Sequence, residues 1–150
     1  MLTFRDALPE DLHFIVGLSI SSAVGSAPDA GKDWSGPAYR EALAAISADP
    51  NQRLLVVERD GAAVGTLQLS VIPGILRGGM WRLLVENVHV VPEARSQGVG
   101  AQMLGWAIAQ ARARNCGLVQ LTSNKARLDA HRFYRRLGFE QSHEGFKLWL

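Results

Sequence analysis

Apolar residues follow two different periods along the chain, and the change of period marks its elements. Between residues 8 and 48 they recur every three or four positions, which predicts two helices. The first begins at Leu8-Pro9-Glu10-Asp11, and the second covers Pro37 to Ala48. From Arg53 to Ile72, aliphatic and β-branched runs predict two strands joined by a hairpin turn at Asp60-Gly61. A short edge strand, Phe4 to Ala7, precedes them all.

The second half of the chain alternates strands with helices. In order, it predicts a central strand (Trp81 to Val91), an amphipathic helix (Gly98 to Ala113), a short strand (Gly117 to Leu121), a helix (Arg127 to Leu137) and two closing strands (Phe139 to Ser142 and Gly145 to Leu150). This order predicts an α/β (mixed α+β) architecture, and 150 residues suit a single domain over 1–150.

Composition narrows the class of protein. Hydrophobic residues make up 47% of the chain and charged residues 20%, as in a folded globular protein. No apolar run is long enough for a membrane span, and the first residues lack the core of a signal peptide. One cysteine, Cys116, allows no internal disulfide, so a cytoplasmic location is expected. The four histidines are scattered, and no metal site is expected.

Basic residues gather in one part of the chain, between Arg95 and Arg136, where Asp129 is the only acid. This asymmetry fits a polyanionic ligand as well as it fits a solvated helix surface. Nucleic acid is the weaker choice of ligand, because no aromatic residues suited to base stacking accompany the arginines.

The most informative stretch is Val85 to Leu104, reading VENVHVVPEARSQGVGAQML. A β-branched run ends at Pro92, a short polar turn follows, and Gly98-Val99-Gly100 opens a helix. The first N–H groups of a helix lack internal partners and carry partial positive charge. The two glycines let an anion approach the backbone, so this stretch predicts a diphosphate cradle.

Arg95-Ser96-Gln97-Gly98-Val99-Gly100 resembles the Arg/Gln-x-x-Gly-x-Gly/Ala motif with which the GNAT acyltransferase superfamily binds acetyl-CoA. The preceding strand and the block from Ala130 to Phe139 also match that family. The resemblance implies a GNAT fold: a mixed, mostly antiparallel sheet of six to seven strands with about four helices, splayed between the fourth and fifth strands. The segment from Thr122 to Lys147 is also similar to aminoalkylphosphonate N-acetyltransferases.

The resemblance assigns residues to the cofactor. Backbone N–H groups of the helix start bind the diphosphate, Arg95 adds a charged contact, and the strand before the turn offers its backbone to the pantetheine arm. Asn124 is implied as a further contact, although a helix N-cap explains it equally well. The full set is Val88, His89, Val90, Arg95, Ser96, Gln97, Gly98, Val99, Gly100, Ala101 and Asn124.

Two residues are candidates for proton transfer. An aliphatic ammonium has a pKa of about 10.4 and must lose a proton before it attacks, and Glu86 is the predicted base, directly or through water. Strand alternation predicts that Glu86 shares a face with Leu84 and Val88, opposite His89. Tyr134, by resemblance, protonates the leaving thiolate. The alternatives are an exposed strand-end acid and a tyrosine packed on the core.

These assignments imply an N-acetyltransferase in which a primary amine, expected to be a small molecule, attacks acetyl-CoA directly. A non-catalytic CoA-binding module and a protein lysine or N-terminal acetyltransferase are the alternatives. The loops Ser21 to Gly36 and Pro73 to Met80 are expected to shape the acceptor pocket. The sequence is compatible with a homodimer but does not decide the oligomeric state.

Overall fold

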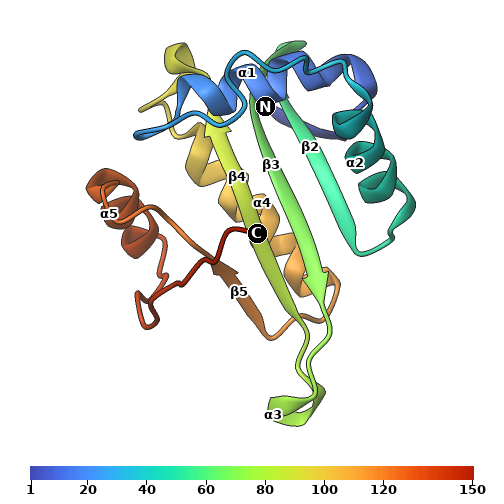
Figure 1. Cartoon of the computed structure of the whole chain (residues 1–150). Coiled ribbons are helices and arrows are strands. Elements are labelled where there is room, and N and C mark those ends of the chain that lie inside the picture. The colour runs from blue at the N-terminus through green and yellow to red at the C-terminus, as the bar shows by residue number, and fades with distance from the viewer.

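Five strands form one mixed sheet in the computed structural model, which describes all residues from 1 to 150 (Figure 1). The strands lie in chain order, and only the last pair, β4 and β5, is parallel. Their bounds are β1 Leu2–Asp6, β2 Gln52–Arg59, β3 Ala62–Ile72, β4 Arg82–Val90 and β5 Leu118–Leu121.

Five α-helices surround this sheet, together with two short 3-10 turns. The helices are α1 Leu12–Ser21, α2 Pro37–Ala48, α3 Leu76–Gly79, α4 Val99–Ala113 and α5 Leu128–Arg136, and the 3-10 turns are Pro9–Asp11 and Pro92–Ala94. Helices α1 and α2 pack on one face of the sheet and α4 on the other, so the molecule has three layers (Figure 1). The mixed α/β prediction is confirmed, and α2 has the predicted bounds.

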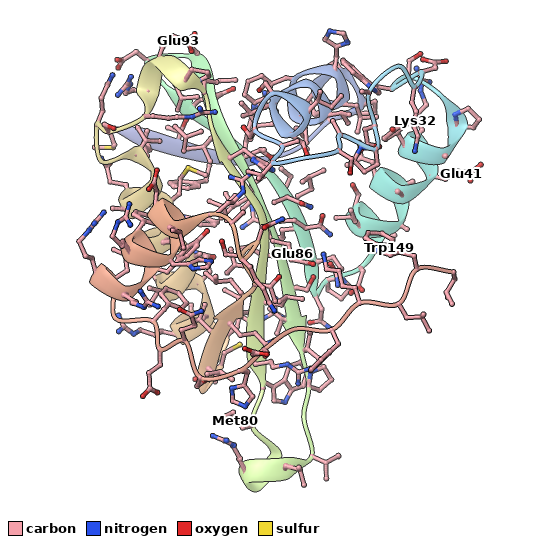
Figure 2. All side chains as sticks on the ribbon, turned by 60° about the vertical axis from the view of Figure 1, so that its left-hand side comes forward. Lys32, Glu41, Met80, Glu86, Glu93 and Trp149 are labelled. Carbon is pink, nitrogen blue, oxygen red and sulfur yellow. The ribbon has the colours of Figure 1, made fainter.

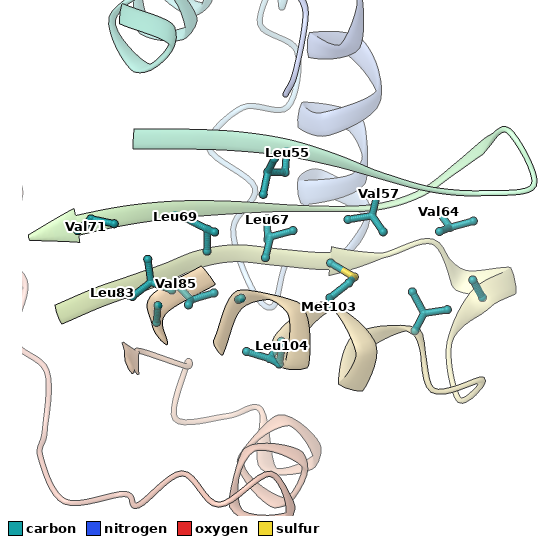
Figure 3. Packing of buried hydrophobic residues seen from close by; sticks show 14 residues of the cluster. Leu55, Val57, Val64, Leu67, Leu69, Val71, Leu83, Val85, Met103 and Leu104 are labelled. Carbon is teal, nitrogen blue, oxygen red and sulfur yellow. The ribbon is translucent and has the colours of Figure 1, made fainter. Parts of the chain in front are cut away.

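The main core lies between the sheet and α4 (Figure 3). Alternate residues of β2, β3 and β4, among them Leu55, Leu67 and Leu83, meet Met103 and Leu104 of α4. The helix presents these side chains because they recur at helical spacing, while the strand residues recur at every second position. A smaller cluster on the opposite face joins β2 to α1 and α2.

Gly65 of β3 is a point of close backbone approach, one of the two roles, with a bulge, that a glycine within a strand indicates. A Cβ at this position would lie 2.8 Å from the backbone oxygen of His89 and 3.1 Å from Sδ of Met103. The residue faces α4, so the sheet and the helix depend on its missing side chain for their spacing.

We expect Gly65→Ala to destabilise the fold by roughly 1–3 kcal/mol, because a buried backbone oxygen and a core side chain must both move. The matched control is Gly105→Ala on α4, where a Cβ meets nothing within 4 Å. That change should stabilise the fold by about 0.5–1 kcal/mol. Urea unfolding measures both, and equal midpoints for the two variants would contradict the packing described.

The C-terminal segment differs from the prediction. Residues 139–142 and 145–150, expected as two strands, form no strand, so the sheet has five strands and not six or seven. The alternation of Phe146, Leu148 and Leu150 is typical of a strand, but a strand also needs a hydrogen-bonded neighbour. Here these side chains are exposed and the segment pairs with nothing.

No helix of the structure combines the length and the apolar character that crossing a membrane requires. The predicted loop between β3 and β4 contains the single-turn helix α3, which projects beyond the end of the sheet (Figure 1).

Candidate active site

Strands β4 and β5 separate halfway along β4, as the resemblance implied. Their pairing runs from Arg82–Leu118 to Val85–Leu121 and then stops. From Glu86 to Val90, β4 therefore has an edge that no strand covers, and α5 lies on the side of this opening (Figure 1). An uncovered strand edge offers backbone groups to an extended ligand.

A bulge in β4 changes which side chains share a face. Glu86 pairs with Gln68 of β3, but His89 pairs with Thr66, so three steps on β4 match two on β3. Asn87 takes up the extra residue at a φ of 52°. Glu86 and His89 therefore lie on the same face of the sheet.

Two predictions about faces are therefore wrong. His89 does not lie opposite Glu86, and Val88 does not share its face but packs against the core on the α4 side. Both errors came from assuming unbroken strand alternation. Leu84, two residues before the bulge, does share the face of Glu86, since it pairs with Ser70 as Glu86 pairs with Gln68.

The turn before α4 has the features of an anion cradle. Ser96 and Gly98 both adopt positive φ values, 59° and 78°. No backbone or side-chain acceptor within the chain binds any N–H group from Ser96 to Ala101. Backbone N–H groups in such a turn, at the N-terminus of a 15-residue helix, form a concavity that suits a phosphate.

The side chains of the turn fix its position. Arg95 donates from Nε to the carbonyl oxygen of Val90 at 3.0 Å and from Nη2 to Oγ of Ser22 at 3.2 Å. Gln97 accepts from Arg59 at 2.9 Å and donates to the carbonyl oxygen of Glu93 at 2.6 Å. The turn is thus tied to α1 and β2, while its N–H groups stay free.

Gly100 lies where α5 approaches the first turn of α4. A Cβ at this position would lie 3.4 Å from Cζ of Phe133 on α5, at the near limit of ordinary van der Waals contact. The next residue of α5 is Tyr134.

Tyr134 lies between two aromatic rings, with ring centroids 5.2 Å from Phe133 and 5.9 Å from Phe139. Burial raises the pKa of its hydroxyl, an effect that the charge of Arg127 partly opposes. The hydroxyl makes no hydrogen bond within the chain, whereas the hydroxyl of Tyr39 donates to Asp29 at 2.6 Å. Tyr134 is therefore a protonated phenol at pH 7 whose hydroxyl has no partner within the chain.

Glu86 is exposed and its carboxylate has no ion-pair or hydrogen-bond partner in the chain. Figure 2 shows Glu86 near the middle of the sheet, away from Lys32 and Glu41 beside α2. His89 is half-buried, and burial lowers its pKa, with the charges of Arg127 and Arg95 acting in the same direction. The imidazole is therefore neutral at pH 7.

Asn124 supports the turn that leads into α5. Its Oδ1 accepts the N–H of Ala126 at 2.9 Å, and its backbone oxygen accepts the N–H of Arg127 at 2.9 Å. The side-chain oxygen is therefore occupied within this turn, but Asn124 is not the helix N-cap, because α5 is preceded by Arg127 and has no side-chain cap. Arg127 also donates to the backbone oxygen of Ser22, so α1 ends between two arginines, Arg95 and Arg127.

One of the two predicted acceptor loops borders a cavity. The loop from 31 to 35 lines an open cavity of about 850 Å³ together with His13, whose ring contacts that of Trp34 with centroids 4.8 Å apart. Trp34 also donates to the backbone oxygen of Asp29 at 2.9 Å, so it anchors this loop. No three His, Cys, Asp or Glu side chains come together as a metal site.

The model of the acetyltransferase (GNAT) family matches residues 24–139, most of the chain. Over 109 residues, the chain is 38% identical to an aminoalkylphosphonate N-acetyltransferase of Salmonella typhimurium, covering 73% of this chain and 70% of that protein. The chain therefore belongs to the acetyltransferase (GNAT) family and is an acetyl-CoA-dependent N-acetyltransferase.

Solved structures agree with this fold. A Bacillus halodurans C-125 protein described as a transcriptional regulator superposes with a TM-score of 0.92 at 37% identity, covering 100% of both chains. An acetyltransferase of Clostridium acetobutylicum, solved with acetyl-CoA, superposes with a TM-score of 0.70 at 19% identity, covering 99% of this chain and 96% of that one. The second likeness concerns the fold alone.

Proposed function

We propose that this protein transfers an acetyl group from acetyl-CoA to a primary amine of a small molecule, by direct attack within a ternary complex. The observation that carries the proposal is one continuous ligand path. Free N–H groups from Ser96 to Ala101 lead to the uncovered edge of β4, which ends at Glu86. A diphosphate at the turn and an extended arm along the edge fit this path.

Acetyl-CoA supplies the acetyl thioester. The uncovered backbone near Val88 would donate an N–H to the thioester oxygen, where negative charge develops during attack. Arg95, tied to Val90 and Ser22, would hold the turn and add positive charge beside the phosphates. The side chains of Val88 and Val90 remain core residues.

Two side chains would move protons. Glu86, exposed and unpaired at the inner end of the path, would take a proton from the ammonium of the acceptor, directly or through water. Tyr134, protonated and without a partner, would give its proton to the departing thiolate. A thiol pKa of about 8.5 lies below that of a phenol, so Tyr134 would first donate a hydrogen bond to the sulfur. The proton would pass to sulfur late, and the second proton lost by the attacking nitrogen would restore the phenol.

The acceptor is proposed as a small molecule, with aminoalkylphosphonates as the first class to test because the Salmonella typhimurium relative carries that name.

The exposed C-terminal side chains, among them Phe146 and Trp149, support a homodimer as a further proposal. Apolar residues exposed this fully favour a second surface to cover them.

We expect thiol release from acetyl-CoA in the presence of a primary amine, with intersecting lines in steady-state kinetics at varied concentrations of both substrates. Direct attack makes no acetyl-enzyme, so acid quenching should trap none. The amine panel should include phosphonates, amino acids, aminoglycosides and a lysine peptide. Saturable CoA binding without turnover on any amine would instead favour a non-catalytic CoA-binding module, and turnover on the peptide alone would favour a protein acetyltransferase.

A further inference from the structure

The face of the sheet that α1 and α2 partly cover carries polar side chains in the middle of β3. Thr66, Gln68 and Ser70 all point to this face, since Leu67, Leu69 and Val71 point to the core on the other side. Thr66 and Ser70 are buried, and Gln68 is half-buried. Polar groups in such positions need partners.

Two of these three side chains have their partners within the chain. Thr66 donates from Oγ1 to the backbone oxygen of Leu55 at 2.8 Å, and Ser70 donates from Oγ to Oε1 of Gln52 at 2.7 Å. Gln68 differs from both. Its Oε1 accepts a long hydrogen bond, 3.5 Å, from Nδ2 of Asn87, the bulge residue, and its Nε2 donates to nothing in the chain.

The free amide of Gln68 lies directly beside the proposed base. Gln68 and Glu86 are cross-strand partners, so their Cβ atoms are about 4.5–5.5 Å apart on one face of the sheet. This face therefore offers two neighbouring groups, the carboxylate of Glu86, which accepts hydrogen bonds, and the amide N–H of Gln68, which donates them. A ligand that satisfies both has a donor, such as an ammonium, a few bonds from an acceptor oxygen.

We propose that Gln68 determines acceptor specificity: its Nε2 binds an oxygen carried by the acceptor, a few bonds from the amine that Glu86 receives. The preferred acceptor is then a short primary amine bearing a phosphonate, carboxylate or hydroxyl group. This inference rests on the proposed function of the same site. Gln68 was not among the residues that the sequence indicated, because a glutamine in a strand carries no motif.

The test compares two acceptors that share an aminoethyl group, 2-aminoethylphosphonate and propylamine, in wild type and in Gln68→Leu. In Gln68→Leu, kcat/KM for the oxygen-bearing amine should fall about ten- to a hundredfold, the range of one lost hydrogen bond to a charged group. The fall for propylamine should be much smaller, so the selectivity ratio changes. Amines bearing a carboxylate or a hydroxyl, assayed in the same way, identify which oxygen group the site prefers.

Two further variants separate recognition from structure. Gln68→Glu replaces the donor with a carboxylate, which repels an oxyanion, and should lower the selectivity ratio at least as far as Gln68→Leu does. Ser70→Ala changes the same face of the same strand, but at a hydroxyl that Gln52 already satisfies, and should keep the wild-type ratio. Thermal unfolding of each variant reports whether the fold is retained.

The outcomes are distinct. Wild type that acetylates propylamine as well as every oxygen-bearing amine overturns the inference, and so does an unchanged ratio in Gln68→Leu. An equal loss for all amines together with a raised KM for acetyl-CoA also overturns it, because Gln68 would then support the cofactor. No turnover by wild type on any amine overturns the proposed function and this inference with it.

Discussion

Replacing Tyr134 with phenylalanine lowers kcat by about 10²- to 10³-fold and raises the KM for acetyl-CoA far less, if the hydroxyl protonates the leaving thiolate. The ring keeps its packing against Phe133 and Phe139, so the change removes only one oxygen. Because that oxygen has no hydrogen-bond partner in the chain, its loss should leave stability almost unchanged. Steady-state kinetics and a thermal melt measure the two effects.

The matched control is Tyr39→Phe, the same change at the other tyrosine of the chain. It removes a hydrogen bond to Asp29, in the segment between α1 and α2, and should lower the midpoint of thermal unfolding slightly while kcat stays within about threefold. Unchanged turnover in Tyr134→Phe would remove Tyr134 from the mechanism.

The pH profile of kcat gives a second readout for the hydroxyl of Tyr134. Burial raises the pKa of Tyr134 above its ordinary value of about 10, so the hydroxyl keeps its proton to higher pH than a free phenol does. Wild-type kcat should therefore show no loss from this group below about pH 10. A fall near neutral pH that disappears in Tyr134→Phe would contradict the assignment.

Replacing Glu86 with glutamine lowers kcat/KM for the amine by about 10²-fold at pH 7, because the variant must wait for the unprotonated amine. An ammonium of pKa about 10.4 leaves little unprotonated amine at pH 7, and removing the ammonium proton at this pH costs roughly 4–5 kcal/mol. The loss should shrink as pH rises toward the pKa of the amine. Rate measurements from pH 6 to pH 10 test this.

Glu41→Gln is the control for charge alone. Glu41 is an exposed acid on α2, separate from Glu86 in Figure 2, and its loss should leave the pH profile of kcat/KM unaltered. If Glu86→Gln showed the same profile as wild type, the base would lie elsewhere, and the neutral, half-buried His89 on the same face would be the next residue to test.

Local patterns in the sequence predicted most of the elements. The Asp60-Gly61 turn joins β2 to β3 with both residues at positive φ, 54° and 78°, as an Asp-Gly hairpin requires. Helix α2 ends before Asp49-Pro50 because the residue preceding a proline is pushed out of the helical region. The turn before α4 was also predicted, since its glycine and its position after a strand are local features.

The faces of β4 could not be predicted in the same way. Strand alternation is local, but a bulge depends on how one strand pairs with its neighbour, and Asn87 alone does not reveal it. The bulge moved His89 to the face of Glu86, and the register with β3 placed Gln68 beside both. The approach of Phe133 to Gly100 likewise depends on two elements far apart in the sequence.

The sequence by itself therefore determined the order of the elements as far as α5 and the glycine-containing turn before α4. Those features arise from backbone preferences and side-chain periods that act within a few residues. Only the tertiary structure decided the residue, Val85, after which β4 leaves β5, the pairing of Gln68 with Glu86, and the unpaired C-terminal segment. These depend on strand register and packing, which non-local contacts set.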